Sequence, residues 1–302
     1  MFAQTMKSAA YVVTLVANPE DSALSDALIA RAAQALPGFA GSHWLNPGVA
    51  ADLFYDGEID ARAAVTPIVA PERIDVIAQA TAGRAKRLLV ADMDSTLIGQ
   101  ECIDELANFA GVGAYVAAIT ERAMRGEITF EPALRERVAL LAGLPESVID
   151  EVLATRITLT PGARTLVRTM RARGGHAAIV SGGFLQFTGA IAQRIGASEH
   201  RANRLLTAAG KILGTVADPI LGADAKLQAL GEISARLGLA PQETLAVGDG
   251  ANDLAMLGAA GLGVAFRAKP AVAARAHARV DHADLTALLY AQGIGVDEFV
   301  AG

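Results

Sequence analysis

Four short apolar runs constrain the fold of this chain more than any other feature of its sequence. They occupy residues 87–92, 176–181, 244–249 and 262–266, and stretches with a helical pattern separate them. Continuous apolar strands that alternate with helices are typical of a parallel sheet covered by helices on both faces. The sequence therefore predicts an α/β fold built on a Rossmann-like parallel sheet.

Polar residues end three of these runs. Asp92 ends the first and is followed by Asp94, Ser181 ends the second, and Asp249 ends the third. In an open parallel sheet, ligands bind at the carboxyl ends of the strands. We therefore expect these residues to meet at one edge of the sheet, although they lie far apart in the sequence.

The stretch between the first two runs is too long for a single crossover helix. It holds more than 80 residues and four segments with a helical pattern, at 102–109, 114–125, 130–141 and 146–153. In the third segment, Leu134, Val138 and Leu141 form an apolar face at helical spacing. We expect this insertion, at about residues 100–160, to form a helical cap over the site.

The first part of the chain differs from the rest in charge. Residues 1–80 hold four basic and nine acidic side chains, a net charge of −5, whereas the whole chain carries −6. We expect strands at 11–16, 42–45 and 50–55 in this part, and a helix at 22–36. We therefore expect a small α+β module at residues 1–80 and a second domain at residues 81–302.

Composition excludes several classes of function. The chain carries 26 basic and 32 acidic residues, so it lacks the overall positive charge that would bind nucleic acid or an anionic membrane. Its longest uncharged apolar stretch, 254–266, is shorter than the roughly 18–20 residues that a membrane-spanning helix needs. A single cysteine, Cys102, excludes an intramolecular disulfide and a multi-cysteine zinc site. We expect Cys102 to be a small buried residue in a cytoplasmic protein.

The segment 92–96 places two carboxylates directly after an apolar strand. A carboxylate held at such a strand end, here Asp92, can attack phosphorus as a nucleophile. A second carboxylate two residues later, Asp94, can protonate the leaving oxygen and afterwards activate water. Two acids this close also suit a hard divalent cation. Taken alone, the pattern also occurs as an ordinary acidic turn.

Three further features have matching chemistry. The loop 248–253 offers oxygen ligands that suit Mg²⁺, and it lacks the spacing of an EF-hand. Ser181 and the two glycines after it offer a hydroxyl and backbone N–H groups to an oxyanion. Lys226 can place an ammonium group against a phosphate. Each feature alone also has an ordinary explanation: a polar turn, a strand-to-helix turn or a surface lysine.

Together, in this order along a parallel α/β pattern, these motifs resemble those of the haloacid dehalogenase-like phosphatase superfamily. Residues 94–101, 124–130 and 134–138 further resemble the phosphoserine phosphatase branch, in which a helical cap recognises the substrate. The resemblance covers about residues 86–290, and Asp224 departs from it because some members have Asn there. Residues 1–80 resemble, more weakly, an amino-acid-binding (ACT-like) module.

The resemblance implies a role for each matching residue. Asp92 is similar to the nucleophile that becomes an aspartyl-phosphate, and Asp94 to the general acid and base. Asp92, Asp94 through its backbone carbonyl, and Asp249 resemble the protein ligands of Mg²⁺. The groups expected to hold the phosphoryl oxygens belong to Ser181, Gly182 and Lys226.

The resemblance also assigns residues to the organic part of the substrate. Glu101 and Arg137 would face the amino and carboxylate groups of serine, since a zwitterion needs one acid and one base and arginine suits a planar carboxylate. Met124 and Phe130 would line the closed cap. Asn252 and Asp253 are expected either behind the metal or beside the substrate.

The resulting expectation is a cytoplasmic, Mg²⁺-dependent phosphoserine phosphatase that releases serine and phosphate in the last step of serine biosynthesis. It would act on a small molecule, with no nucleic acid or membrane as partner, and a homodimer stays open. One alternative is a phosphatase or phosphotransferase of the same superfamily acting on another small phosphorylated metabolite such as phosphohomoserine. Another is a non-catalytic amino-acid sensor, against which the complete set of Asp92, Asp94, Lys226 and Asp249 argues.

Overall fold

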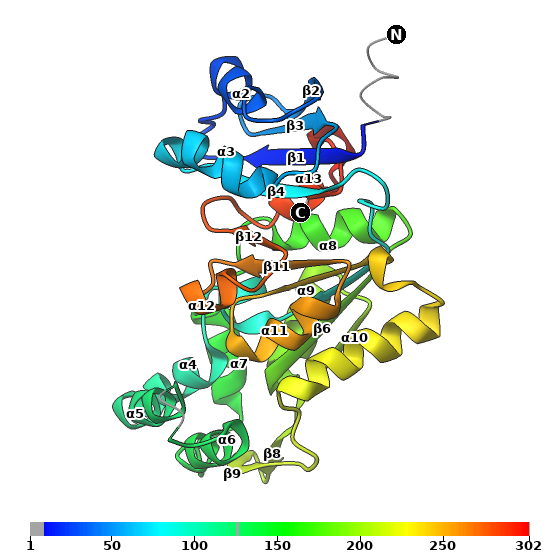
Figure 1. Cartoon of the computed structure of the whole chain (residues 1–302). Helices are drawn as coiled ribbons and strands as arrows, with labels where there is room; N and C mark the ends of the chain where they lie inside the picture. The colour runs from blue at the N-terminus through cyan, green and yellow to red at the C-terminus, as the bar shows by residue number, and fades with distance from the viewer. Residues whose placement is uncertain (1–8, 125–126, 302) are drawn as a thin grey trace.

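A six-stranded parallel sheet forms the centre of the larger part of the chain (Figure 1). The computed structural model describes residues 9–124 and 127–301, without the side chains of residues 123 and 124. The strands of this sheet are β5 (Leu88–Ala91), β6 (His176–Phe184), β7 (Glu199–Asn203), β10 (Thr244–Gly248), β11 (Leu262–Phe266) and β12 (Ala278–Val280). Their order is β12-β11-β10-β5-β6-β7, and every neighbouring pair is parallel.

Successive side chains of the four inner strands pack into two different cores. In β5, Leu89 packs into the core that includes α8 (Ala163–Ala172) and α9 (Leu185–Ile195). Leu88 and Val90 pack into the core formed with α10 (Ala223–Leu237), α11 (Leu254–Ala259) and α12 (Pro270–Ala273). The predicted α/β class, with helices on both faces of a parallel sheet, is therefore confirmed. In the described part of the chain, every helix is too short or too polar to cross a membrane.

Two edge strands of this sheet have no counterpart among the predicted apolar runs. β7 has the polar sequence Glu-His-Arg-Ala-Asn, and β12 has only three residues. An edge strand has one neighbour instead of two, so it tolerates charged residues and short length. Hydrophobic pattern alone therefore identified the four inner strands and missed both edges.

The helices of the cap follow β5 after a turn. They are α4 (Cys102–Phe109), α5 (Gly113–Met124), α6 (Phe130–Ala139) and α7 (Ser147–Thr155). A hairpin of β8 (Leu205–Ala208) and β9 (Lys211–Val216) extends the cap, because the Gly143 N–H donates to the Ile212 carbonyl at 2.8 Å. Figure 1 shows α5, α6 and the hairpin at the end of the molecule opposite the N-terminal sheet.

The N-terminal part folds as a small antiparallel sheet with two helices. Its elements are β1 (Tyr11–Val16), α2 (Asp26–Ala33), β2 (Phe39–Asn46), β3 (Ala50–Tyr55), α3 (Ala61–Val69) and β4 (Asp75–Ala80). The strand order is β2-β3-β1-β4. Leu15 and Leu53 face a core that contains residues of both helices. We call residues 9–80 the front module from here on.

The other face of the front module's sheet shares a core with the larger domain. Val16 and Ile77 belong to the same buried cluster as Leu288 and Tyr290 of α13 (Ala287–Ala291). Figure 1 shows α13 between this sheet and α8. A separate contact is polar: the buried carboxylate of Asp75 accepts the backbone N–H groups of residues 281, 282 and 283 at 2.9, 3.0 and 2.8 Å.

A buried ion pair also lies at this interface. Arg84, in the segment that joins the two parts, places Nη2 2.8 Å from Oδ2 of Asp52 in β3. The same nitrogen donates to the Tyr290 carbonyl at 3.1 Å. One guanidinium therefore connects the front module to α13.

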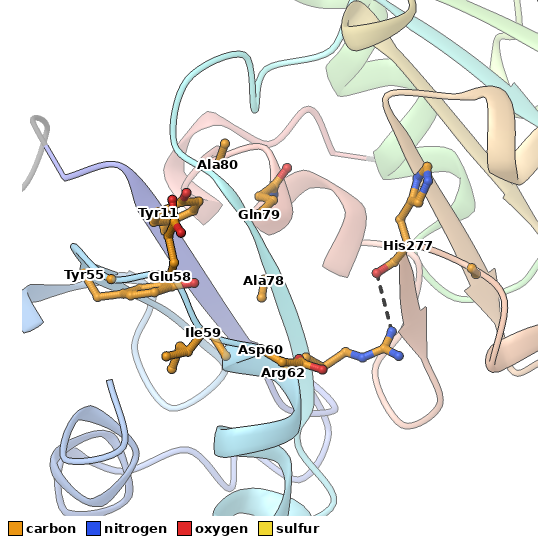
Figure 2. Close-up of a pocket in the computed structure, with 13 residues that line it drawn as sticks. Tyr11, Tyr55, Glu58, Ile59, Asp60, Arg62, Ala78, Gln79, Ala80 and His277 are labelled. Carbon is orange, nitrogen blue, oxygen red and sulfur yellow. Dashed lines mark hydrogen bonds between the residues drawn. The ribbon is translucent and has the colours of Figure 1, made fainter. Parts of the chain in front are cut away.

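A cleft of about 650 Å³ opens beside this interface (Figure 2). Its wall includes the stacked rings of Tyr11 and Tyr55, whose centroids are 5.5 Å apart. Across the cleft, Arg62 Nη1 donates to the His277 carbonyl at 3.4 Å. None of the residues predicted to take part in chemistry lines this cleft. The predicted residues lie instead at the strand ends of the parallel sheet.

Candidate active site

Neighbouring strand ends bring the predicted acids together. Asp92 directly follows β5 and Asp249 directly follows β10, and these two strands are paired in the sheet. Carboxylate oxygens of Asp92, Asp249 and Asp253 all lie within 4.8 Å of one another. The structure thus brings Asp92 and Asp249 together, as the strand ends predicted, and adds Asp253. These three residues form what we call the acidic cluster.

A tight turn after β5 directs Asp92 and Asp94 to different places. Asp92 Oδ1 accepts the Met93 N–H at 2.7 Å, which begins the turn. Ser95, with φ 53° and ψ 8°, adopts the left-handed conformation within this turn. The carboxylate of Asp94 therefore lies outside the acidic cluster, where its Oδ1 accepts the Cys102 N–H at 3.3 Å.

Lys226 is a fully buried cation in the first turn of α10, and not a surface lysine. Its Nζ lies 2.6 Å from Asp92 Oδ2 and 2.6 Å from Asp253 Oδ1, and only 2% of its side chain is exposed. Burial alone would lower the pKa of this ammonium, but the two carboxylates raise it above its usual value. Lys226 therefore stays charged beside Asp92.

Burial and the mutual repulsion of the carboxylates raise the pKa values of two members of the acidic cluster. Burial raises the pKa of Asp249 to about 6 and that of Asp253 to about 7, and the neighbouring charge of Asp92 contributes to both shifts. Asp253 is already engaged, because its Oδ2 accepts the Gly250 N–H at 3.0 Å and its Oδ1 faces Lys226. Asp92 and Asp249 are thus the members best placed to share a divalent cation through oxygen ligands.

At neutral pH, Asp94 is in its protonated form and can donate a proton. Burial raises its pKa to about 8, and the charges of Glu101 and Asp92 add to the shift. The residue whose N–H holds this carboxylate is Cys102, which is completely buried as predicted. A carboxyl group that keeps its proton at neutral pH suits a general acid.

The predicted phosphoryl-binding segment lies beside Asp94. A Cβ on Gly183 would be 2.8 Å from Asp94 Oδ2 and 3.1 Å from Ser181 Oγ, so both side chains lie against this glycine. Ser181 Oγ accepts the Gly183 N–H at 2.9 Å. Because that bond uses the oxygen as an acceptor, the hydroxyl hydrogen of Ser181 is available to a ligand.

Glu101 and Arg137 enter the site from the cap. Glu101 precedes α4, and its Oε1 accepts the Ser95 hydroxyl at 2.6 Å. Arg137, on α6, donates from Nε to the Ala133 carbonyl at 3.2 Å and from Nη1 to Thr120 Oγ1 at 3.4 Å. Burial raises the pKa of Glu101, and the charge of Arg137 opposes that shift. The two opposite charges are therefore close enough to influence each other.

Three other residues were predicted to bind substrate, and the structure describes the side chains of two of them. The ring of Phe130 lies on the glycine segment, since a Cβ on Gly182 would be 3.1 Å from Phe130 Cζ. The side chain of Asn252 folds over Gly250, with Oδ1 2.2 Å from the position of a Cβ there. Met124 ends α5, but its side chain lies outside the described residues.

Two polar residues of the turn were not predicted. Ser95 holds Glu101, as described above, and Thr96 Oγ1 donates to Asp249 Oδ1 at 3.3 Å. Both belong to the segment 92–96, in which the carboxylates are the residues with a recognisable chemical pattern. The left-handed backbone at Ser95 has no signature in the sequence, so the contact of Ser95 with Glu101 could not be predicted.

The sequence is similar to those of known hydrolases. A family model described as haloacid dehalogenase-like hydrolase matches residues 89–258. A phosphoserine phosphatase of Mycobacterium tuberculosis is 45% identical over 240 residues, which cover 79% of this chain and 58% of that protein. A phosphoserine phosphatase of Streptomyces coelicolor is 47% identical over 228 residues, which cover 76% of this chain and 55% of that protein. The chain thus spans little more than half the length of these relatives.

A solved structure matches both parts of the chain. The crystal structure of a probable phosphoserine phosphatase from Vibrio cholerae superposes with a TM-score of 0.78 and is 33% identical. The match covers 97% of this chain and 89% of that one, so it includes the front module.

Proposed function

The chain belongs to the haloacid dehalogenase-like hydrolases, and on that basis we propose that it hydrolyses O-phosphoserine to serine and inorganic phosphate. The observation that carries the proposal is the buried Asp92–Lys226 pair at a strand edge that Glu101 and Arg137 approach from the cap. The names of the relatives support the same substrate. The reaction is assigned to the cytoplasm, because the single buried cysteine suits a reducing compartment.

The residues at the strand ends fit a hard divalent cation, and the proposal includes Mg²⁺. Asp92, Asp249 and the backbone carbonyl of Asp94 would hold it, while Asp253 holds Lys226 and the loop. When bound, Mg²⁺ would neutralise charge between Asp92 and the anionic phosphate. A set of oxygen donors without His or Cys matches the preference of this ion.

In the first half of the reaction, a carboxylate oxygen of Asp92 attacks phosphorus. The bond between phosphorus and the serine oxygen breaks, and that oxygen takes the proton of Asp94. Lys226, the Ser181 hydroxyl and the Gly182 N–H hold the phosphoryl oxygens while charge shifts onto them. Serine leaves, and an aspartyl-phosphate remains on Asp92.

In the second half, water attacks the phosphorus of the aspartyl-phosphate. Asp94, now ionised, takes a proton from this water, and the bond between phosphorus and the Asp92 oxygen breaks. Asp92 is a free carboxylate again, and inorganic phosphate leaves. The raised pKa of Asp94 suits both of its tasks, since it can release and recover a proton near neutral pH.

The cap supplies the preference for an amino acid. Glu101 can bind the ammonium group of the substrate and Arg137 its carboxylate, and neither residue belongs to the acidic cluster. Phe130, at the start of α6, closes over Gly182 and excludes water.

A screen of phosphate release over a panel of phosphorylated metabolites tests the proposal. We expect the highest kcat/KM for phosphoserine, a lower value for phosphohomoserine, and much lower values for sugar phosphates. Activity should require Mg²⁺ and disappear with EDTA. Excess Ca²⁺ should inhibit, because Ca²⁺ tolerates bidentate carboxylates and a bidentate Asp92 would lose the geometry for in-line attack. A sugar phosphate as the best substrate, or undiminished activity after metal removal, would refute the proposal.

A further inference from the structure

The phosphoryl-binding segment is a bulge in the parallel sheet. β6 and β7 pair in register at Val180 with Arg201 and again at Phe184 with Asn203, so β6 has two more residues than β7 between these pairs. The extra length lies in residues 181–183, which leave the ladder, and a Cβ on Gly183 would lie 2.8 Å from Asp94 Oδ2. Two of these residues are glycines, whose backbone has the greatest freedom. The bulge therefore needs a partner that fixes its shape.

The side chain of Asn203 is that partner. Its Nδ2 donates to the Gly182 carbonyl at 2.8 Å, and the residue is 2% exposed. On the other side of the same peptide unit, the Gly183 N–H donates to Ser181 Oγ at 2.9 Å. The peptide between Gly182 and Gly183 is therefore held at both of its polar groups, in place of the missing ladder bonds.

The same amide holds a second segment of the site. The Leu221 N–H donates to Asn203 Oδ1 at 2.7 Å, and Nδ2 also donates to the Leu221 carbonyl at 3.3 Å. Leu221 precedes Gly222, which caps α10, and the first turn of that helix carries Lys226. Asn203 thus connects the glycine bulge to the start of the helix that supplies the buried ammonium.

Phe130 of the cap rests on both connected segments. A Cβ on Gly182 would lie 3.1 Å from Phe130 Cζ, and a Cβ on Gly222 would lie 3.7 Å from Phe130 Cδ1. The ring therefore packs against two glycines. Asn203 binds the carbonyl of Gly182 and the backbone of Leu221, the residue before Gly222.

We propose that Asn203 is a positioning residue, which sets both the phosphoryl-binding bulge and the seat of the cap. The inference rests on the proposed function and extends it to a residue outside every motif. Asparagine suits the position because carbonyl groups need a donor and the Leu221 N–H needs an acceptor. Aspartate keeps the acceptor but, when ionised, sets a negative charge against two carbonyl oxygens.

Asn203→Asp tests the inference, with Asn203→Ala as a smaller variant without charge. Both should lower kcat/KM about 100-fold on phosphoserine and on p-nitrophenyl phosphate, since misplacement by about 1 Å has an effect of this size. The inhibition constant of inorganic phosphate should rise in parallel, because the bulge binds the group that both substrates share. Folding is checked by the circular dichroism spectrum and by Tm.

Gln186→Leu is the matched control. Gln186 also donates from a side-chain amide to a backbone carbonyl at 2.8 Å, but the acceptor is Leu205, and in the described part of the chain its other amide atom, Oε1, has no hydrogen-bond partner. This variant should lower Tm and leave the phosphate inhibition constant unchanged.

The outcomes separate the inference from the proposed function. The kinetics are measured at a temperature below the Tm of each variant. If the folded Asn203 variants keep the wild-type phosphate inhibition constant and kcat/KM, Asn203 is merely structural and the inference is wrong. If neither variant folds while Gln186→Leu does, the amide serves stability instead, and the inference is also wrong. Failure of the proposed function would appear in the wild-type protein, as absence of phosphate release from phosphoserine.

Discussion

At the scale of single residues, the buried ion pair between Lys226 and Asp92 determines what the site can do. An ammonium that is 2% exposed is stable only because two carboxylates lie 2.6 Å from it. The arrangement holds a positive charge against the carboxylate of Asp92, where the proposed function places the phosphate. In the proposed reaction, the nucleophile and the anion-binding group are therefore in contact before the substrate binds.

Replacing each aspartate of the segment 92–96 should separate their roles. Asp92→Asn should lower kcat by about 1000-fold or more on every substrate, because an amide cannot form the acyl phosphate. Asp94→Asn should lower kcat strongly for phosphoserine and far less for p-nitrophenyl phosphate, whose leaving group needs no proton. Steady-state kinetics on both substrates measures this difference. Equal losses for Asp94→Asn would contradict an acid role, and wild-type kcat for Asp92→Asn would contradict the nucleophile.

The opposite charges of the cap should determine specificity. Glu101→Ala or Arg137→Ala leaves one charge of the zwitterion unpaired, with an expected loss of about 2–4 kcal/mol in kcat/KM for phosphoserine. An aryl phosphate lacks both groups and should lose little. Arg135→Ala is the control, because Arg135 lies on the same helix but pairs with Glu131 and Asp218 at the surface. Parallel losses on both substrates would leave a phosphatase without amino-acid recognition.

Sequence reasoning identified the charged residues of this site because their chemistry is rare in combination. Asp92, Asp249 and Lys226 stand at strand or helix ends, where topology brings them together. Ser95 and Asn203 escaped notice because single polar residues are common. Their roles depend on a left-handed backbone and on a shift in register, and neither leaves a hydrophobic pattern.

At the scale of elements, α11 and β11 lie closer together than a side chain allows. A Cβ on Gly263 of β11 would lie 1.9 Å from the Leu257 carbonyl oxygen of α11. Because both partners are backbone, neither can move without shifting a whole element. The parallel sheet therefore depends on this glycine for the seat of one covering helix.

Two glycine substitutions in these elements should change stability in opposite directions. Gly263→Ala should lower the free energy of unfolding by about 2–4 kcal/mol, through backbone strain in a packed core. Gly258→Ala should raise it by about 0.5–1 kcal/mol, because Gly258 lies inside α11 with nothing within 4 Å of a new Cβ. Urea unfolding measures both. A harmless Gly263→Ala would show that the two elements can separate at little cost.

Prediction of elements succeeded where burial imposes a pattern. Strands buried on both faces read as continuous apolar runs, and the helices of the cap follow from apolar spacing such as that of Leu134 and Val138. The edge strand β7 has a polar sequence, so its place depends on pairing with β6 and not on its own hydrophobicity. The contact of the hairpin with the cap is equally non-local.

At the scale of the whole molecule, the front module is held by a shared core and by buried charges. Asp52 is 1% exposed and depends on Arg84, and Arg84 also satisfies carbonyls of α13. Burial raises the pKa of Asp52, whereas the charge of Arg84 and the Thr14 hydroxyl oppose this rise. Composition indicated a boundary near residue 80, but it gave no sign that the two parts would share apolar contacts.

Arg84→Met should therefore destabilise the chain in a pH-dependent way. Loss of one partner of a buried pair should cost about 3–5 kcal/mol near neutral pH. Without Arg84, the folded pKa of Asp52 rises further above its unfolded value. Stability from the protonated form is then present at low pH and lost as pH rises through the folded pKa, so the variant's deficit should shrink on acidification. Chemical unfolding at several pH values measures this trend.

Arg87→Met is the control for that experiment. Arg87 pairs with Glu243 at 3.2 Å, but its side chain is 63% exposed, so the change should cost less than about 1 kcal/mol. A deficit for Arg84→Met that matches this control, or that grows on acidification, would contradict the role given to the buried pair.

The position of α13 also has a consequence for how the chain is made on the ribosome. Asn46 of the front module contacts Tyr290 of α13, and these residues are 244 positions apart. Because the ribosome adds about 5–20 residues per second, the helix that covers the inner face of the module's sheet is synthesised roughly 10–50 s after the sheet itself. During that interval the nascent module exposes apolar side chains such as Val16 and Ile77, a surface that chaperones bind and that favours aggregation.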